Sequence, residues 1–165
     1  MTLNNLKCIE NLDIDEYYDY FISIKSKMSH PDWLGDLEKD DFIKMINAGG
    51  KTWTYFDNDK FVCSYMYIVG TRKGIDRLGL DYKEEECADC GPMFVDEKYR
   101  GNGLQFQMFQ KLDEYCKQMN KKYILTTAHP ENIYSSNNMI KAGYKKVGSK
   151  TLSRGPRDVY VKIME

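Results

Sequence analysis

The segment that most constrains the fold is a strand that runs through a glycine-rich turn into a helix. Residues 87–95 are predicted to form the strand, and Arg100-Gly101-Asn102-Gly103 the turn. Backbone amides at a helix start have no acceptor within the helix and lie at the positive end of its dipole, so they attract anions. The glycines let the backbone approach such an anion closely. The turn therefore predicts a phosphate or diphosphate site. The predicted helix has an apolar face with helical spacing, made of Leu104, Met108, Phe109, Leu112, Tyr115, Cys116 and Met119.

Three other interpretations of this turn deserve comparison. Asn102-Gly103 is a common hairpin turn, but the residues after it repeat with the period of a helix. A dinucleotide fingerprint would need a third glycine where Phe106 stands, and an acid near residues 121–123, where none occurs. The third interpretation, a turn that only links strand to helix, stays open.

The rest of the chain predicts one domain, residues 1–165, with a mixed order of helices and strands. Residues 70–84 are expected to form an exposed connection. Periodicity and turn residues predict helices at 13–29, 37–47 and 132–142, and strands at 51–56, 60–69, 123–128, 144–152 and 157–164.

Composition excludes several classes of protein. A net charge of −1 without a long basic run argues against nucleic-acid binding. No apolar run is long enough for a membrane span or a leader, so we expect a cytoplasmic protein with no membrane partner. Cys87 and Cys90 form one C-x-x-C pair, but the other three cysteines are scattered, so no metal site is expected.

Two blocks of the sequence resemble the GNAT superfamily of N-acetyltransferases. Arg100-x-x-Gly103-x-Gln105 is similar to the family's turn motif, with Gln105 in place of its last small residue. Asn132 and Ser135, followed by Gly143-Tyr144, match a second block at the family's spacing. The resemblance implies an α/β fold of mixed α+β type. Its sheet would have six to seven mostly antiparallel strands, splayed between the fourth and fifth, with about four helices.

The resemblance also implies acetyl-CoA as cosubstrate, with no metal. The pantetheine arm would lie along Met93, Phe94 and Val95, and Asn132 and Ser135 would face it from the other side. The diphosphate would bind the turn, at Arg100, Gly101, Asn102, Gly103, Leu104 and Gln105.

The chemistry implied is direct attack of an amine on the thioester in a ternary complex. A backbone amide near Phe94 or Val95 would stabilise the oxyanion. Asp89 is the candidate base and Glu86 the other well-placed carboxylate, although both also fit a run of solvated acids. Many family members place a tyrosine where this chain has Met139, which has no proton to give. Water or another element would then protonate the thiolate.

The acceptor expected from the resemblance is a small-molecule or peptide amine. It would be recognised by the first two helices, the loop at Trp33, the tyrosines Tyr65 and Tyr67 and residues 70–84, and an acidic floor would select a cationic amine. For most of these aromatic side chains, packing in the core is the preferred alternative. The alternative function is a non-catalytic acyl-CoA-binding sensor or scaffold, which Met139 favours. A homodimer is compatible with this class, although no exposed apolar stripe in the sequence requires one.

Overall fold

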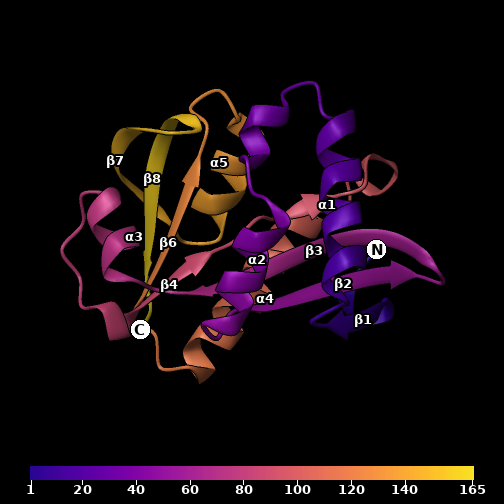
Figure 1. Cartoon of the computed structure of the whole chain (residues 1–165), viewed down its shortest axis with the longest axis horizontal. Coiled ribbons are helices and arrows are strands. Elements are labelled where there is room, and N and C mark those ends of the chain that lie inside the picture. The colour runs from indigo at the N-terminus through magenta and orange to yellow at the C-terminus, as the bar shows by residue number, and fades with distance from the viewer.

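One eight-stranded sheet runs through the molecule and carries helices on both faces (Figure 1). The computed structural model describes all residues, 1–165. The strand order is β1-β2-β3-β4-β6-β8-β7, with β5 paired to β3 beyond the end of β4, and every pairing is antiparallel except that of β4 with β6. The strands are β1 (Lys7–Glu10), β2 (Lys51–Asp57), β3 (Lys60–Val69), β4 (Cys87–Cys90), β5 (Phe94–Val95), β6 (Tyr123–Ala128), β7 (Lys145–Leu152) and β8 (Gly155–Ile163).

Five α-helices accompany the sheet, and most begin at a side chain that accepts hydrogen bonds from the first-turn amides. Asp13, Thr71 and Asn132 cap α1, α3 and α5 in this way. None of the helices has the length and apolar character needed to cross a membrane. The helices are α1 (Ile14–Lys27), α2 (Lys39–Asn47), α3 (Arg72–Arg77), α4 (Leu104–Gln118) and α5 (Ile133–Lys141).

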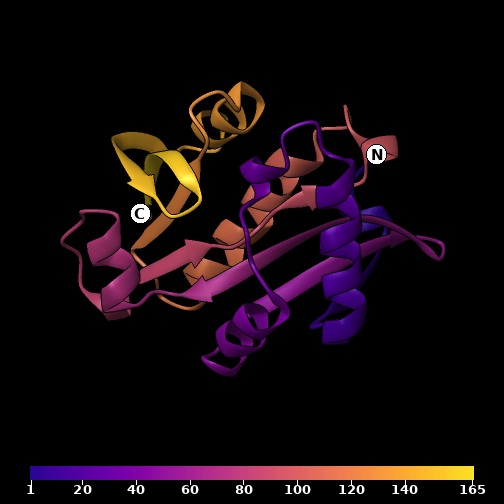
Figure 2. The same ribbon diagram turned by 45° about the horizontal axis from the view of Figure 1, so that its top comes forward.

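Side chains of β3 point alternately to the two faces of the sheet and contribute to two separate hydrophobic cores. Its side chains Cys63, Tyr65 and Tyr67 pack under α4, while Met66 faces α1 and α2. The helices α1 and α2 cover one face of the sheet and α4 covers the other (Figures 1 and 2). The core on the α1–α2 face is a cluster of aromatic rings, and the core under α4 and α5 is larger and mixed in composition. The aromatic cluster contains Tyr17, Phe21, Phe42, Phe56, Phe61 and Phe94.

The predicted central strand is in fact interrupted. The expected strand 87–95 divides into β4 and β5, separated by Gly91-Pro92-Met93. A Cβ on Gly91 would lie 2.7 Å from the Cβ of Met66, so only glycine allows the backbone to pass so close to β3. Pro92 has no amide hydrogen to donate to the ladder. The interruption thus follows from these two residues.

The sheet opens between β4 and β6, the fourth and fifth strands in the order of the fold. The two strands pair only from Cys87 to Asp89 with Tyr123 to Leu125. Beyond this point β6 continues to Ala128 in register with β8, whereas β5 remains with β3. Figure 2 shows α5 and the β7–β8 hairpin on the other side of the opening from α1. The predicted splay is therefore confirmed.

The prediction was wrong or incomplete in three elements. Residues 70–84 contain α3, because Thr71 caps the Gly74 amide and Ile75 and Leu78 bury their side chains against β6 and β8. The edge strand β1 was missed, since its largely exposed side chains give no apolar alternation. The sheet thus has eight strands rather than six to seven, and there are five α-helices rather than about four. The α5 helix also exposes apolar side chains that the sequence did not suggest, namely Ile133, Tyr134 and Ile140.

Candidate active site

Two adjoining clefts occupy the opening of the sheet. The larger, of about 730 Å³, lies between the end of β4 and residues 125–128 of β6. The smaller, of about 310 Å³, extends along β5 to the start of α4. Volumes of this size suit small-molecule ligands. The walls common to both are Trp33, Leu34, Met93, Gln105, Asn132 and Ser135, so the two clefts are continuous.

The start of α4 offers a run of unpaired backbone donors. The amides of residues 101–106 donate to no acceptor in the protein, and the first helical bond of this turn is from the Gln107 amide to the Gly103 carbonyl, at 3.2 Å. No side chain caps this helix, and its first turn contains no acid. Gly101 and Gly103 adopt left-handed conformations, with φ of 83° and 70°, which glycine adopts without strain. The turn therefore has the donors and the backbone shape of an anion site.

The strand β5 presents one set of backbone groups to the opening. The Asp96 amide donates to the Val62 carbonyl at 2.8 Å, so the register makes Val95 a residue not hydrogen-bonded to β3. The N–H and C=O of Val95 therefore point away from β3, toward the cleft. The ring of Phe94, in contrast, is buried among the aromatic cluster.

A chain of hydrogen bonds links α4 to α5 across the cleft wall. The Gln105 side-chain amide donates to Ser135 Oγ at 3.1 Å, and Asn138 Nδ2 donates to Gln105 Oε1 at 2.8 Å. Asn132 Oδ1 accepts from the Ser135 amide at 3.2 Å, which leaves the Asn132 NH₂ group without a protein acceptor. Gln105, longer than the small residue of the related motif, thus joins the two helices.

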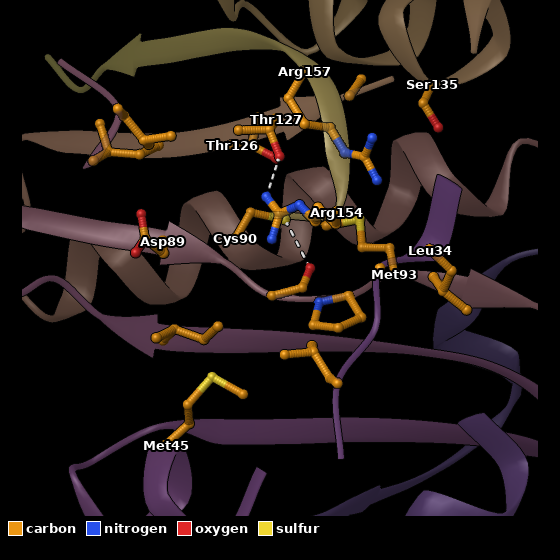
Figure 3. Close-up of a pocket in the computed structure, with 18 of the residues that line it drawn as sticks. Leu34, Met45, Asp89, Cys90, Met93, Thr126, Thr127, Ser135, Arg154 and Arg157 are labelled. Atoms are coloured by element: carbon orange, nitrogen blue, oxygen red, sulfur yellow. Dashed lines mark hydrogen bonds between the residues drawn. The ribbon is translucent and has the colours of Figure 1, made fainter. Parts of the chain in front are cut away.

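Asp89 is the carboxylate of the larger cleft nearest to the strand break. Burial raises its pKa from 3.8 to about 6, against the opposing effect of the Arg77 and Arg154 guanidinium groups. Figure 3 shows Asp89 in the same cleft as Arg154 and Arg157. A carboxylate with such a pKa is ionised at neutral pH and basic enough to accept a proton. Glu86 lies outside both clefts and pairs with Lys122 at 3.9 Å.

Most of the residues assigned to the site from the sequence lie in the two clefts. Asn102 and Gly103 do not line them, although their amides belong to the unpaired run. Tyr65 and Tyr67 lie in the core under α4 rather than in the site. The remaining predicted positions line one or both clefts: Asp89, Met93, Phe94, Val95, Arg100, Gly101, Leu104, Gln105, Asn132 and Ser135, together with Trp33 and Met139.

Sequence reasoning missed the cationic residues of the larger cleft. Arg154 comes from the β7–β8 turn and Arg157 from the start of β8, far from every motif, and Arg77 comes from the unexpected α3. Tyr134, also not assigned, lines the smaller cleft. No local pattern marks these residues, because only the closing hairpin and α3 bring them to the opening. No group of three or more His, Cys, Asp or Glu side chains is arranged to hold a metal ion.

The sheet is mixed and opens between two parallel strands, and a helix start without a side-chain cap lies beside the opening. This is the architecture of the acetyltransferase class whose motif the turn resembles. The sequence matches the Acetyltransferase (GNAT) family over residues 10–144, and the chain belongs to this family. No curated protein sequence matches it.

Solved structures share the fold along the whole chain. A GNAT-family acetyltransferase from Streptococcus agalactiae is 19% identical, with a TM-score of 0.77 over 100% of this chain and 99% of that one. An acetyltransferase from Bacillus subtilis, solved in complex with CoA, is 12% identical, with a TM-score of 0.67 over 98% and 100%. AAC(6')-Ib, solved with paromomycin and acetyl-CoA, is 16% identical, with a TM-score of 0.67 over 95% and 93%.

Proposed function

We propose that this protein is an N-acetyltransferase that moves an acetyl group from acetyl-CoA to an amine by direct attack in a ternary complex. The observation that carries the proposal is the run of unpaired amides at residues 101–106, placed beside the opening between β5 and β6. The B. subtilis relative in complex with CoA supports the choice of cosubstrate.

The turn at the start of α4 would bind the diphosphate. The amides of residues 101–106 would donate to its oxygens, and Arg100, which lines the smaller cleft, would add a full positive charge. Charge-assisted hydrogen bonds contribute roughly 1.5–3 kcal/mol each, so a few of them would account for most of the affinity for the cosubstrate.

The two walls of the opening would hold the pantetheine arm. Val95 directs its N–H and C=O toward the gap and would pair with the arm as a strand does. Asn132, whose NH₂ group has no protein acceptor, would donate from the opposite wall, next to Ser135. An amide of this part of β5, best placed at Val95, would also stabilise the oxyanion.

Acetyl-CoA supplies a thioester whose carbonyl carbon is open to attack. An alkylamine with a pKa of about 10.4 is protonated at neutral pH, and removing its proton costs about 4.6 kcal/mol. Asp89 would accept that proton, directly or through water. The amine nitrogen then bonds to the carbonyl carbon, the carbon–sulfur bond breaks, and the sulfur leaves as a thiolate.

The thiolate needs no tyrosine from α5. Met139, buried in the wall of the larger cleft, has no proton to donate. A thiol has a pKa of about 8.5, so its release as a thiolate near neutral pH costs only about 2 kcal/mol. We infer that water protonates the departing sulfur, and the amide and free CoA are the products.

Reversal of the charge at the turn tests the diphosphate site. Arg100→Glu replaces an attractive charge with a repulsive one beside the six amides, so CoA should bind at least about tenfold more weakly by isothermal titration calorimetry. Lys98→Glu makes the same charge change two residues away, outside both clefts, and should cost less than about threefold at 0.15 M salt. Equal affinities for Arg100→Glu and the wild type would remove the assignment.

The second candidate function is a non-catalytic acyl-CoA-binding module, and Met139 in the position of the usual acid favours it. An assay of free CoA thiol across a panel of amines separates the two candidates. The acetyltransferase releases thiol with at least one amine and increases the mass of that amine by about 42 Da, because an acetyl group replaces one hydrogen. Tight CoA binding without release for any amine would favour the module.

A further inference from the structure

The larger cleft has an unusual balance of charge. Its charged side chains include five cations, Lys44, Lys73, Arg77, Arg154 and Arg157, but only two acids, Asp41 and Asp89. None of these five cations forms an ion pair, although eight other lysine or arginine side chains pair with a carboxylate elsewhere in the protein. The chain as a whole carries a net charge of −1. The cleft is therefore a local positive site, and the expected acidic floor is absent.

Arg154 is a half-buried cation of the cleft wall, and most of its hydrogen-bonding capacity is unused. Its guanidinium makes one hydrogen bond, to Thr127 Oγ1 at 2.8 Å (Figure 3). Its aliphatic carbons lie near Gly35, where a Cβ would be 3.7 Å from Arg154 Cδ. Burial, with the nearby charges of Arg157 and Arg77, lowers its pKa to about 10. A half-buried guanidinium with four free N–H donors and no carboxylate partner is suited to bind an anionic group.

The two neighbouring arginines have different parts in this site. Arg157 is buried and donates to the backbone carbonyls of Pro156 and Asp32, so it fixes the Trp33 segment to β8. Two of its five N–H donors are used in these bonds, and its charge adds to the positive potential. Arg77 is exposed on α3, makes no hydrogen bond within the protein, and lines the cleft on the side of Asp89. It can therefore move toward a ligand held by Arg154.

Asp89 and Arg154 lie in one cleft without forming an ion pair with each other. A ligand with an ammonium group and an acidic group a few bonds apart would complement both. We propose that the acceptor is an amine that carries a carboxylate or a similar acidic group, bound by Arg154 with Arg77 while its nitrogen faces Asp89. This inference rests on the proposed acetyltransferase function and names the substrate class.

Matched pairs of amines test this inference. The common amino acids are each assayed beside the amine that lacks the carboxylate, for example phenylalanine beside phenylethylamine, with spermidine and paromomycin as polycationic amines. The assay follows release of CoA thiol by the full-length protein. Because one charge-assisted pair is worth at least about a tenfold change, the best carboxylate-bearing amine should exceed its partner by that factor in kcat/KM.

The variant Arg154→Gln should remove this preference and leave CoA affinity within about twofold of the wild type. Lys145→Gln, an exposed cation of β7 outside both clefts, should keep the preference. Equal kcat/KM within each pair, or a preference for the polycations, would overturn the inference and leave the proposed function in place. A large loss of CoA affinity in Arg154→Gln would also overturn it, because the arginine would then serve the nucleotide. Absence of turnover with every amine would contradict the proposed function, and this inference with it.

Discussion

Asp89→Asn should abolish most of the acetyl transfer and at the same time stabilise the protein above pH 6. The asparagine keeps the shape of the side chain but cannot accept the proton of the amine. Loss of a general base typically costs 10²–10⁴-fold in rate, and we expect kcat/KM to fall within about that range. CoA affinity, measured by calorimetry, should be unchanged, because Asp89 lies in the larger cleft and not at the turn.

The effect of Asp89→Asn on stability follows from the raised pKa of the carboxyl group. Its pKa is about 6 in the fold against an ordinary value of 3.8, so the folded protein binds this proton more tightly than the unfolded chain. The contribution of Asp89 to stability is therefore fully present below about pH 4 and is lost as pH rises through 6. At pH 7 to 8 the variant should have a free energy of unfolding up to about 3 kcal/mol above that of the wild type.

Urea denaturation at several pH values measures this difference, which should shrink toward zero near pH 4. In the wild type, kcat/KM should rise as pH passes about 6, because Asp89 must lose its proton to act as a base. Glu86→Gln is the matched control, since Glu86 lies outside both clefts. It should change neither the free energy of unfolding nor kcat/KM appreciably. Full activity in Asp89→Asn would exclude this residue as the base.

Phe94→Ala should destabilise the fold strongly, although Phe94 also lines the smaller cleft. The ring of Phe94 lies 5.6 Å from those of Phe21 and Phe61 and 5.7 Å from that of Tyr17, measured between centroids. Removal of a buried phenylalanine ring costs about 3–5 kcal/mol, through lost burial and the cavity left behind. Because Phe94 anchors the two residues of β5 to the aromatic cluster, CoA affinity should fall as well.

Phe106→Ala provides the comparison for Phe94→Ala. Phe106 lies in the first turn of α4 and is only partly buried, beneath the Lys141 ammonium at 4.4 Å from its ring centroid. Its loss should cost about 1 kcal/mol, in line with its smaller burial. Urea titration of both variants measures the loss of free energy of unfolding at each position, and the loss should be larger for Phe94→Ala. A cost at Phe94 no larger than that at Phe106 would contradict the role of the ring as the anchor of β5.

The turn could be located from the sequence because all the residues that define it lie in one continuous segment. A strand, two glycines and a helical repeat occupy one continuous segment, and the structure places its six unpaired amides beside the opening. The splay of the sheet came from the resemblance of two motif blocks rather than from periodicity. A glycine and a proline at positions 91 and 92 are residues that interrupt a strand. The need for glycine at position 91 cannot be inferred locally, because it arises from the close approach to Met66 on the neighbouring strand β3.

The acceptor side of the site could be predicted only in part. Trp33 and residues 70–84 were expected there, and Trp33 and Arg77 do line the larger cleft, but the arrangement of its cations depends on distant parts of the chain. Arg154 and Arg77 reach the cleft only through the pairing of β8 with β6 and the packing of Ile75 and Leu78 on those strands. Their local sequences look like an ordinary turn and an exposed connection. The acidic floor expected from the resemblance is not found, because the cleft contains more cations than acids and the glutamates of residues 84–86 lie outside both clefts.

The central claim is that the backbone amides of residues 101–106 hold the diphosphate of acetyl-CoA. A titration of ¹⁵N-labelled protein with CoA, followed amide by amide, tests it most directly. Saturable changes should be largest at Gly101 to Phe106 and at Val95. The nucleotide 3′,5′-ADP, which has a single 5′-phosphate and no pantetheine arm, should shift the Val95 amide less than CoA does. Saturable binding with these six amides unmoved, or no binding at millimolar CoA, would contradict the account.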